Sequence, residues 1–437
     1  MIRKSSGLVA GLLTAAIFLF LCGSASADDY HYTNLLIGDR ASGMGGAYTA
    51  VADDATGLYY NPAGAAYATG RSISASVNAY YSTEKVYKNV IGGNDWVRES
   101  SSLLPNYFGV VQPAGKFKVG ISYAVPDSIM EDQDQSFTDI NFGPTLQQYN
   151  PGAKIATYII NFNNESSSLN FGPSIAVELS ESLSTGLTLY YYERTSQWIL
   201  NQEIKTNLGG YEWTNNYFEI EEWGIRPVLG FMWAPVDTVS VGLSVSNIVI
   251  QGSNTKIQYS YRRENIAFPD PSTGNVISNV ISMPDAPSSY GEKRKYPYQI
   301  GLGLAWFPSQ SLLVSADINH YTAVHYTVVR DYDFEAVTNF SLGAEYYLAK
   351  AWAMRAGFFT DFANTQKISK NDIDQDEHID LYGATLSLSH FTRNTSVTLG
   401  AGYTYGEGDA QIVGGINQVQ DVTSEGLMLF LSSSFSY

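Results

Sequence analysis

The chain of 437 residues is acidic, with 42 Asp and Glu against 25 Lys and Arg and a formal net charge of −17 at pH 7. Such a charge repels nucleic acid and argues against a phosphate-backbone partner. The single cysteine excludes internal disulfides and thiolate metal sites. The 32 Tyr, 20 Phe and 39 Gly are typical of membrane β-barrels with aromatic girdles rather than of helical enzymes.

Residues 1–27 have the three parts of a cleavable Sec signal peptide. Arg3 and Lys4 form a basic head, Leu8 to Leu21 an apolar core, and Ala25-Ser26-Ala27 a small-residue cleavage site. The apolar run is too short for a membrane anchor, and no other stretch reaches ~18 uninterrupted apolar residues. We therefore expect a secreted chain that begins at residue 28 and contains no cysteine.

Residues 28–70 lack the alternation of a strand and are predicted to form a plug, or hatch. Their most specific part is the string RASGMGGAYTAVADDATGLYYNPAG, which runs from Arg40 to Gly64. Its small side chains suit close packing, and we expect a short helix at 47–55 that ends at Asn61-Pro62. Asp53 and Asp54 would lie near the end of that helix, where the dipole requires basic partners, and we expect lumenal arginines to supply them.

From residue 71 to 437 the sequence alternates with the period of β-strands. Tight turns are predicted at 113–115, 180–182, 235–237, 308–310, 349–350 and 392–394, and longer loops near 84–104, 128–166, 201–216, 251–295, 328–334, 362–377 and 408–421. Thirteen connections give fourteen strands. Short turns at one end and long loops at the other are typical of outer-membrane barrels, whose turns face the periplasm.

Each predicted strand has one apolar and one small or polar face. Val239 to Ser246 alternates valine or leucine with serine or glycine, and the last strand, Leu427 to Tyr437, ends on an aromatic residue. A soluble β-sandwich would also alternate, but it explains neither the signal peptide nor the terminal strand. The expected fold class is all-β, a 14-stranded antiparallel transmembrane β-barrel with an N-terminal plug in its lumen, in the outer membrane of a Gram-negative-type cell.

This register points several ionisable side chains into the lumen, where they avoid the roughly 2–4 kcal/mol cost of a charge facing lipid. The candidate lumen charges are Arg194, Glu222, Arg226, Asp317, Glu345 and Arg355, together with Glu178. One interpretation is a network of ion pairs that braces the lumen and plug. The other is that Arg194, Arg226 or Arg355 binds the anionic head of a substrate.

The string in the plug resembles the FadL/TodX (OMPP1) family of outer-membrane transporters of hydrophobic compounds. The resemblance rests on Gly45-Gly46-Ala47, Asp53-Asp54-Ala55 and Asn61-Pro62-Ala63. It implies that Gly45, Gly46, Asp53, Asp54, Asn61, Pro62 and Ala63 belong to a hatch that gates a fourteen-strand barrel. It also implies that ligands leave sideways through a gap at a kinked third strand.

The third predicted strand, Phe117 to Asp127, contains two candidates for that kink. Pro126 cannot donate a ladder hydrogen bond, and Gly120 would loosen the strand. The simpler interpretation is that Pro126 ends the strand at a loop. A gap would appear as a break in pairing between the second and third strands.

The leading hypothesis is a passive uptake channel for long-chain fatty acids or aromatic hydrocarbons, whose partners are outer-membrane lipids and a hydrophobic ligand. The alternative is a scaffold or shuttle in an envelope secretion complex, as in the similar PorV-like branch, with unknown envelope proteins as partners. A plain porin fits less well, because the plug closes the bore.

The predicted lumen is more polar than a fatty-acid conduit should be. Its apolar lining is limited to Tyr190, Tyr192, Val228, Phe359, Met428 and Phe430, and Ile155, Tyr158, Ile159, Ile160 and Phe162 are candidates to cap the mouth.

No catalytic or cofactor motif is found, so we expect no enzyme and no cofactor. Asp372, Asp374 and Asp376 are spaced like the first three ligands of a calcium-binding loop. The glycine expected after them is Glu377, however, and the glutamate expected to close the loop is Gly383. A solvated acidic loop is the preferred interpretation.

Overall fold

The computed structural model describes residues 30–436 except 69, 270–274, 329, 374 and 413–417. The predicted signal peptide and Asp374 lie outside the described residues. None of the helices in the described ranges is long and apolar enough to cross a membrane.

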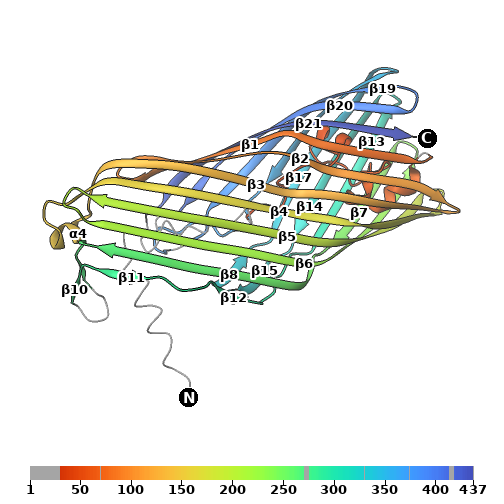
Figure 1. Cartoon of the computed structure of the whole chain (residues 1–437). Helices are drawn as coiled ribbons and strands as arrows, with labels where there is room; N and C mark the ends of the chain where they lie inside the picture. Colours follow the sequence, from red (N-terminus) through yellow and green to blue (C-terminus); the bar gives the residue numbers. More distant parts are fainter. Residues whose placement is uncertain are drawn as a thin grey trace.

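The described strands form a closed antiparallel barrel of fourteen strands, which confirms the predicted fold class (Figure 1). The barrel closes where β1 pairs with β21 from Ser72↔Ser436 to Tyr87↔Val422, so neither end of the sheet is left as an open edge. The seventh strand is divided into β7 and β8, and β11 and β12 precede β13 in the eighth.

In chain order the barrel strands are β1 (Ser72–Ile91), β2 (Asn94–Ala114), β3 (Phe117–Asn141), β4 (Lys154–Ser180), β5 (Leu183–Thr206), β6 (Tyr211–Val236), β7 (Val239–Ser246), β8 (Val249–Glu264), β11 (Val280–Ser282), β12 (Ser288–Tyr290), β13 (Gln299–Ser309), β14 (Leu312–Tyr321), β17 (Val337–Ala349), β18 (Trp352–Asp361), β19 (His378–Phe391), β20 (Thr395–Ala410) and β21 (Gln420–Ser436). Outside the barrel sheet, β9 (Phe268–Pro269) pairs with β10 (Val276–Ile277), and β15 (Val324–Val328) with β16 (Arg330–Phe334). Helix α4 (Pro144–Tyr149) lies in the connection between β3 and β4.

All six predicted tight turns join consecutive strands, but several predicted loops are wrong. Most of 84–104, 128–166 and 201–216 and the start of 251–295 are strand, because β1 to β6 and β8 continue far beyond the expected loop boundaries. Strands β3 and β4 stay paired as far as Asn141↔Lys154. This side of the barrel is therefore much taller than the side made by β13 to β18 (Figure 1).

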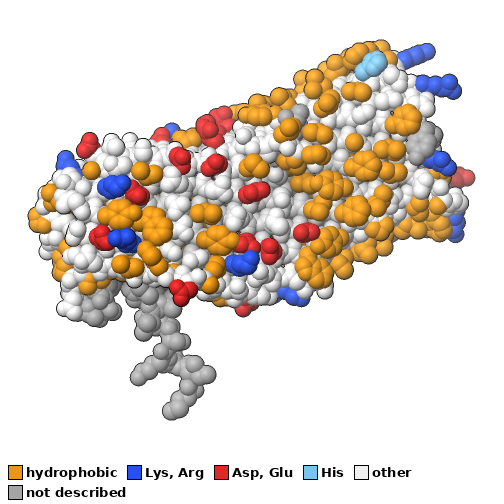
Figure 2. All heavy atoms as spheres, in the orientation of Figure 1, with side chains coloured by type: hydrophobic (Ala, Val, Ile, Leu, Met, Phe, Trp, Pro, Cys, Tyr) orange, Lys and Arg blue, Asp and Glu red, His pale blue; other side chains and the backbone are white. Residues whose placement is uncertain are grey.

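The outer surface is apolar over only one half of this tall wall (Figure 2). On β6, the outward positions are apolar without interruption from Trp223 to Trp233, which are 48% and 51% exposed, whereas Glu219 and Glu221 occupy the two outward positions before them. Eleven residues is the length that a tilted strand needs to cross the hydrocarbon layer, and tryptophans mark its two interfaces. The half of β6 before Trp223 therefore lies beyond the apolar band, on the side opposite the tight turns.

The plug lies inside the barrel near the C-terminal end of β21 (Figure 1). It contains helices α2 (Asp39–Gly43) and α3 (Gly57–Tyr60) and the 3-10 helix η2 (Pro62–Tyr67). The helix expected at 47–55 is wrong: this segment is a series of turns. Two of its backbone N–H groups bind the wall, since Asp317 accepts from Tyr48 N (2.8 Å) and Thr49 N (2.7 Å). Val51 N and Ala52 N both donate to Tyr48 O, which makes a turn rather than a continuous helix.

Candidate functional site

Asn61 of the Asn-Pro-Ala triplet ties the plug together and joins it to the wall. Its side chain is fully buried, donates to Thr49 O (2.7 Å) and Phe231 O (3.1 Å), and accepts from Ala63 N (3.2 Å). The last contact makes it the N-cap of η2, whose first residue is Pro62. The sequence predicted that Asn61-Pro62 would end a helix, and the structure places the start of the 3-10 helix η2 there.

The plug backbone lies directly against glycines of the barrel wall. Six glycines of the wall point inward at places where a Cβ atom would overlap atoms of the plug, most of them backbone atoms. The positions are Gly186 (β5), Gly230 (β6), Gly242 (β7), Gly303 (β13), Gly343 (β17) and Gly357 (β18). At these six positions the wall has no side chain, and this absence allows the close approach.

A chain of ion pairs connects the plug with the wall. Arg40 donates to Asp53 Oδ1 (2.6 Å) and, through Nε and Nη2, to both carboxylate oxygens of Glu345 (2.9 and 2.8 Å). Arg355 also binds Glu345 (2.5 Å) and donates to Ser389. The basic partner of Asp53 is therefore Arg40 of the plug itself, and the wall contributes the buried acid.

Asp54, unlike Asp53, is bonded to a backbone N–H group of the plug, and its carboxyl group has a raised pKa. Its carboxylate accepts from Thr56 N (2.8 Å). Burial, and then the carboxylates of Asp39 and Asp53, raise the pKa of Asp54 from 3.8 to about 6. A raised pKa means that the packed plug binds this proton more tightly than the unpacked chain. The resulting stabilisation is complete below pH 3.8 and is lost as the pH rises through about 6.

We expect Arg40→Ala to loosen the plug more than Asp53→Ala. Glu345 is fully buried and keeps Arg355 as its other partner. The loss of Arg40 is therefore expected to cost less than the about 3–5 kcal/mol of a buried charge left without any partner, but more than the loss of a surface pair. Asp53 is 45% exposed, and such surface pairs contribute roughly 0–1 kcal/mol. Protease cleavage within the plug of the detergent-purified protein measures the difference. Equal cleavage of the two variants would contradict this ranking.

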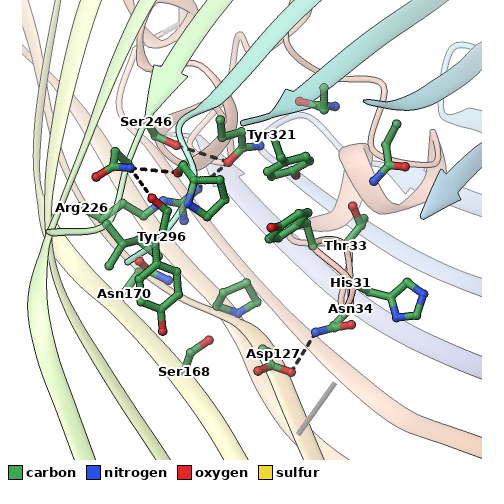
Figure 3. A pocket seen from close by; sticks show the side chains of 18 of the residues that line it. His31, Thr33, Asn34, Asp127, Ser168, Asn170, Arg226, Ser246, Tyr296 and Tyr321 are labelled. Carbon is green, nitrogen blue, oxygen red and sulfur yellow. Dashed lines mark hydrogen bonds between the residues drawn. The ribbon is translucent and has the colours of Figure 1, made fainter. Parts of the chain in front are cut away.

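A cavity of about 210 Å³ lies between the plug and the tall part of the barrel (Figure 3). Its floor includes Gly45, Gly46, Tyr59 and Tyr60 of the plug. Residues 31–36, the arm that leads into the plug, line one side of it. In Figure 3, Arg226, Tyr296 and Ser246 lie on one side of the cavity, and Thr33 and Tyr321 lie on the other.

The cavity combines cationic and aromatic side chains. Its cations are Arg194, Arg226, Arg294 and Lys295, and its one acidic lining residue is Asp127, which accepts from Asn34 Nδ2 (3.2 Å). Its aromatic lining residues are Tyr32, Tyr59, Tyr60, Tyr192, Tyr296, Tyr321, Tyr326, Phe334 and Phe359. Rings of Tyr32 and Tyr321 stack with centroids 4.2 Å apart.

A packed apolar core fills the tall part of the barrel at its outer end. It includes Ile155, Tyr158, Ile160 and Phe162, all at most 5% exposed, whereas Ile159 of the predicted cap is only partly buried. Further members come from β1, β2, β5, β19, β20 and β21 and the connecting segments. The mouth of the barrel is therefore covered by side chains from strands on several sides.

The seam between β2 and β3 loses continuous pairing along much of the described length of the two strands. The ladder runs from Ala114↔Phe117 only as far as Tyr107↔Ala124. Against β4, the register of β3 shifts by one residue between Ala124 and Asp127, which is a β-bulge that contains Pro126. Interpreting Pro126 as the end of the strand was wrong, because β3 continues to Asn141.

Side chains and the arm bridge this open seam. At its lower end Leu35 N donates to Pro126 O (3.1 Å), and Asn106 Nδ2 donates to Leu36 O (2.8 Å). Higher up, Gln133 donates to Glu99 O (2.9 Å) and Arg98 pairs with Glu131 (2.7 Å). These contacts replace backbone pairing with groups that can separate without breaking a ladder.

The structure brings together only part of the predicted candidate residues. Arg194, Glu222, Arg226, Asp317, Glu345 and Arg355 are all at most 7% exposed inside the barrel, whereas Glu178 is exposed near a tight turn. Gly120 lies below the bulge, at a position where a Cβ atom would overlap the side chain of Leu58 of α3. No cluster that could hold a metal ion occurs among the described residues, which include Asp372 and Asp376.

Several cavity residues were not predicted. Arg294 and Lys295 lie in the irregular segment before β13, where no periodicity indicates the direction of a side chain. The run Lys293-Arg294-Lys295 is a basic cluster in an acidic chain, and this contrast was the available signal.

Comparisons with known proteins agree with this architecture. The family model described as outer membrane protein transport protein (OMPP1/FadL/TodX) matches residues 23–428. No curated protein matches the sequence.

Several solved structures share the fold at low sequence identity. A FadL homologue of Pseudomonas aeruginosa aligns over 93% of this chain and 99% of its own, with 13% identity and a TM-score of 0.59. The toluene transporter TodX of P. putida aligns over 92% and 98%, with 14% identity and a TM-score of 0.60. The monoaromatic hydrocarbon channel CymD aligns over 92% and 97%, with 14% identity and a TM-score of 0.54.

Proposed function

Because the chain belongs to the OMPP1/FadL/TodX family of outer-membrane transport proteins, we propose that it admits compact hydrophobic molecules, of single-ring size, through its plugged barrel. It is an outer-membrane protein, as the sequence predicted, and the family consists of transport channels. The family match does not favour the alternative of a secretion scaffold.

The observation that carries the proposed substrate size is the cavity above the plug. Its volume of about 210 Å³ is below the roughly 300–1,000 Å³ of pockets for drug-sized ligands. Its aromatic rings offer flat apolar contacts to a single ring. Two of the similar structures are a toluene transporter and a monoaromatic hydrocarbon channel. These points favour aromatic compounds over long-chain fatty acids.

The proposed exit is the seam between β2 and β3. The apolar core blocks the mouth, and the plug is fixed to the wall by Asn61 and Arg40. At the seam, the cavity is lined by Leu35 and Leu36 of the arm and by Pro126 and Asp127 of β3, and hydrogen bonds join the arm to β3 and to Asn106 of β2. Leu103 and Met130, on the two strands that border the seam, are 72% and 52% exposed and offer an apolar rim.

Uptake of radiolabelled toluene tests the proposal. We expect cells that carry the protein in their outer membrane, and lack other channels of this family, to accumulate toluene faster than cells with an empty vector. Palmitate uptake, measured in parallel, should rise less. Equal toluene uptake with and without the protein would exclude this function.

A further inference from the structure

The cavity above the plug has a local charge opposite to that of the chain. The whole sequence has 42 acidic and 25 basic residues, yet the cavity lining has four cationic side chains and one carboxylate. Two further acids lie behind the lining. Glu222 accepts from the Tyr296 hydroxyl and is the ladder partner of Arg194, and Asp361 accepts from Tyr32 N and Thr33 N, so the cations still outnumber the acids by one. A low-dielectric cavity that concentrates one sign of charge attracts a ligand group of the other sign.

Arg226 is the cation best placed to meet such a group. It is 7% exposed, and its guanidinium lies 4.8 Å from the ring centroid of Tyr59. Its Nη2 donates to Gln299 Oε1 (3.3 Å), which also accepts from Ser246. Gln299 and Tyr59 thus fix the orientation of a planar donor group, and a guanidinium held in this way matches a carboxylate in bidentate geometry.

The cationic group lies beside aromatic surface. Arg294 approaches the rings of Tyr296 and Tyr326 with centroid distances of 5.5 and 5.8 Å. Across the cavity lies Tyr321 (Figure 3), whose ring stacks on that of Tyr32 and offers a flat apolar surface. A small cavity with cations at one side and rings at the other has space for a ring with one charged substituent, but not for a long chain.

We propose that the cavity selects a compact aromatic carboxylate, with the carboxylate on Arg226 and the ring among the tyrosines. This inference rests on the proposed transport function and specifies the ligand of the same site. Gln299 and Tyr59, which hold Arg226, are neutral, so a carboxylate adds a charge-assisted contact to this guanidinium that a neutral hydrocarbon does not offer, and the anionic ligand binds more tightly. Arg226 is then a specificity-determining residue, because its removal weakens binding of the anion and leaves that of the neutral ring.

Isothermal titration calorimetry of the detergent-purified full-length protein tests this selection at pH 7.5. The probes are benzoate, toluene and palmitate, and the variants are Arg226→Gln and, as a control, Arg262→Gln. Arg262 is an exposed arginine of β8 that pairs with Glu264 (2.5 Å). We expect benzoate to bind wild type and the control equally, and Arg226→Gln at least tenfold more weakly. Toluene affinity should change less than twofold.

Two outcomes would overturn the inference. One is equal benzoate affinity in wild type and Arg226→Gln, and the other is tighter binding of toluene or palmitate than of benzoate by wild type. Circular dichroism and heat-resistant migration on gels show that the variants remain folded barrels. If toluene uptake persists while benzoate does not bind, only the charge selection fails. If neither compound is bound or taken up, the proposed function fails with it.

Discussion

Replacing Gly242 or Gly357 by alanine is expected to unseat the plug and make the barrel leak. A Cβ atom on Gly242 would overlap the carbonyl group of Thr49, and one on Gly357 would overlap the backbone at Met44 and Gly45. Backbone atoms in a turn cannot move aside as a flexible side chain can. Overpacking of this kind costs about 1–3 kcal/mol at each position, so we expect the double variant to lose plug packing.

Liposome swelling in a small sugar measures the leak, and we expect at least a tenfold increase in rate for the double variant. Gly402→Ala is the matched control, because this inward glycine of β20 faces mainly the flexible side chain of Met428 and the methyl group of Thr385. Its swelling rate should equal that of wild type. A swelling rate equal to that of wild type in the double variant would mean that contacts at these glycines do not hold the plug in place.

The sequence predicted the strands best where one face meets lipid. Between Trp223 and Trp233 of β6 the outward residues are apolar, and alternation reveals the register. Directly beyond the apolar band both faces of a strand are polar, before the inward face becomes apolar again in the outer core. On β5, for example, Glu193 and Thr195 point outward while Arg194 points inward. Alternation disappears there although the strand continues, which is why the extensions were predicted as loops.

The plug shows what a local pattern can and cannot indicate. The string around Asn61 predicted that the segment packs in the lumen, since small residues and turn formers allow little else. The partners of its charges depend on which wall residue lies opposite. Arg40 and Glu345 are 305 residues apart, and no local spacing relates them.

The gap at the third strand could be stated only as a hypothesis from the sequence. A β-bulge depends on how two strands pair, and the sequence of one strand does not show that pairing. Pro126 alone fits both a strand end and a bulge. The deciding observation is that β4 pairs with β3 on both sides of the bulge, at Ala124↔Asn170 and at Asp127↔Ser168. Between these two pairs β3 advances by three residues and β4 by two. The one extra residue in β3 therefore bends that strand away from β2 while β4 supports it.

Deletion of Pro126 is expected to abolish uptake by closing the seam. Removing one residue cancels the shift between Ala124 and Asp127, so that β3 can continue its ladder with β2 above Tyr107. Restored backbone hydrogen bonds, each contributing about 0.5–1.5 kcal/mol, would hold the two strands together. We expect toluene uptake to fall at least tenfold, to the level of cells without the protein. Pro126→Ala is the matched control, because it keeps the extra residue and should keep most uptake. Persisting uptake in the deletion variant, with the barrel folded, would place the exit elsewhere in the wall.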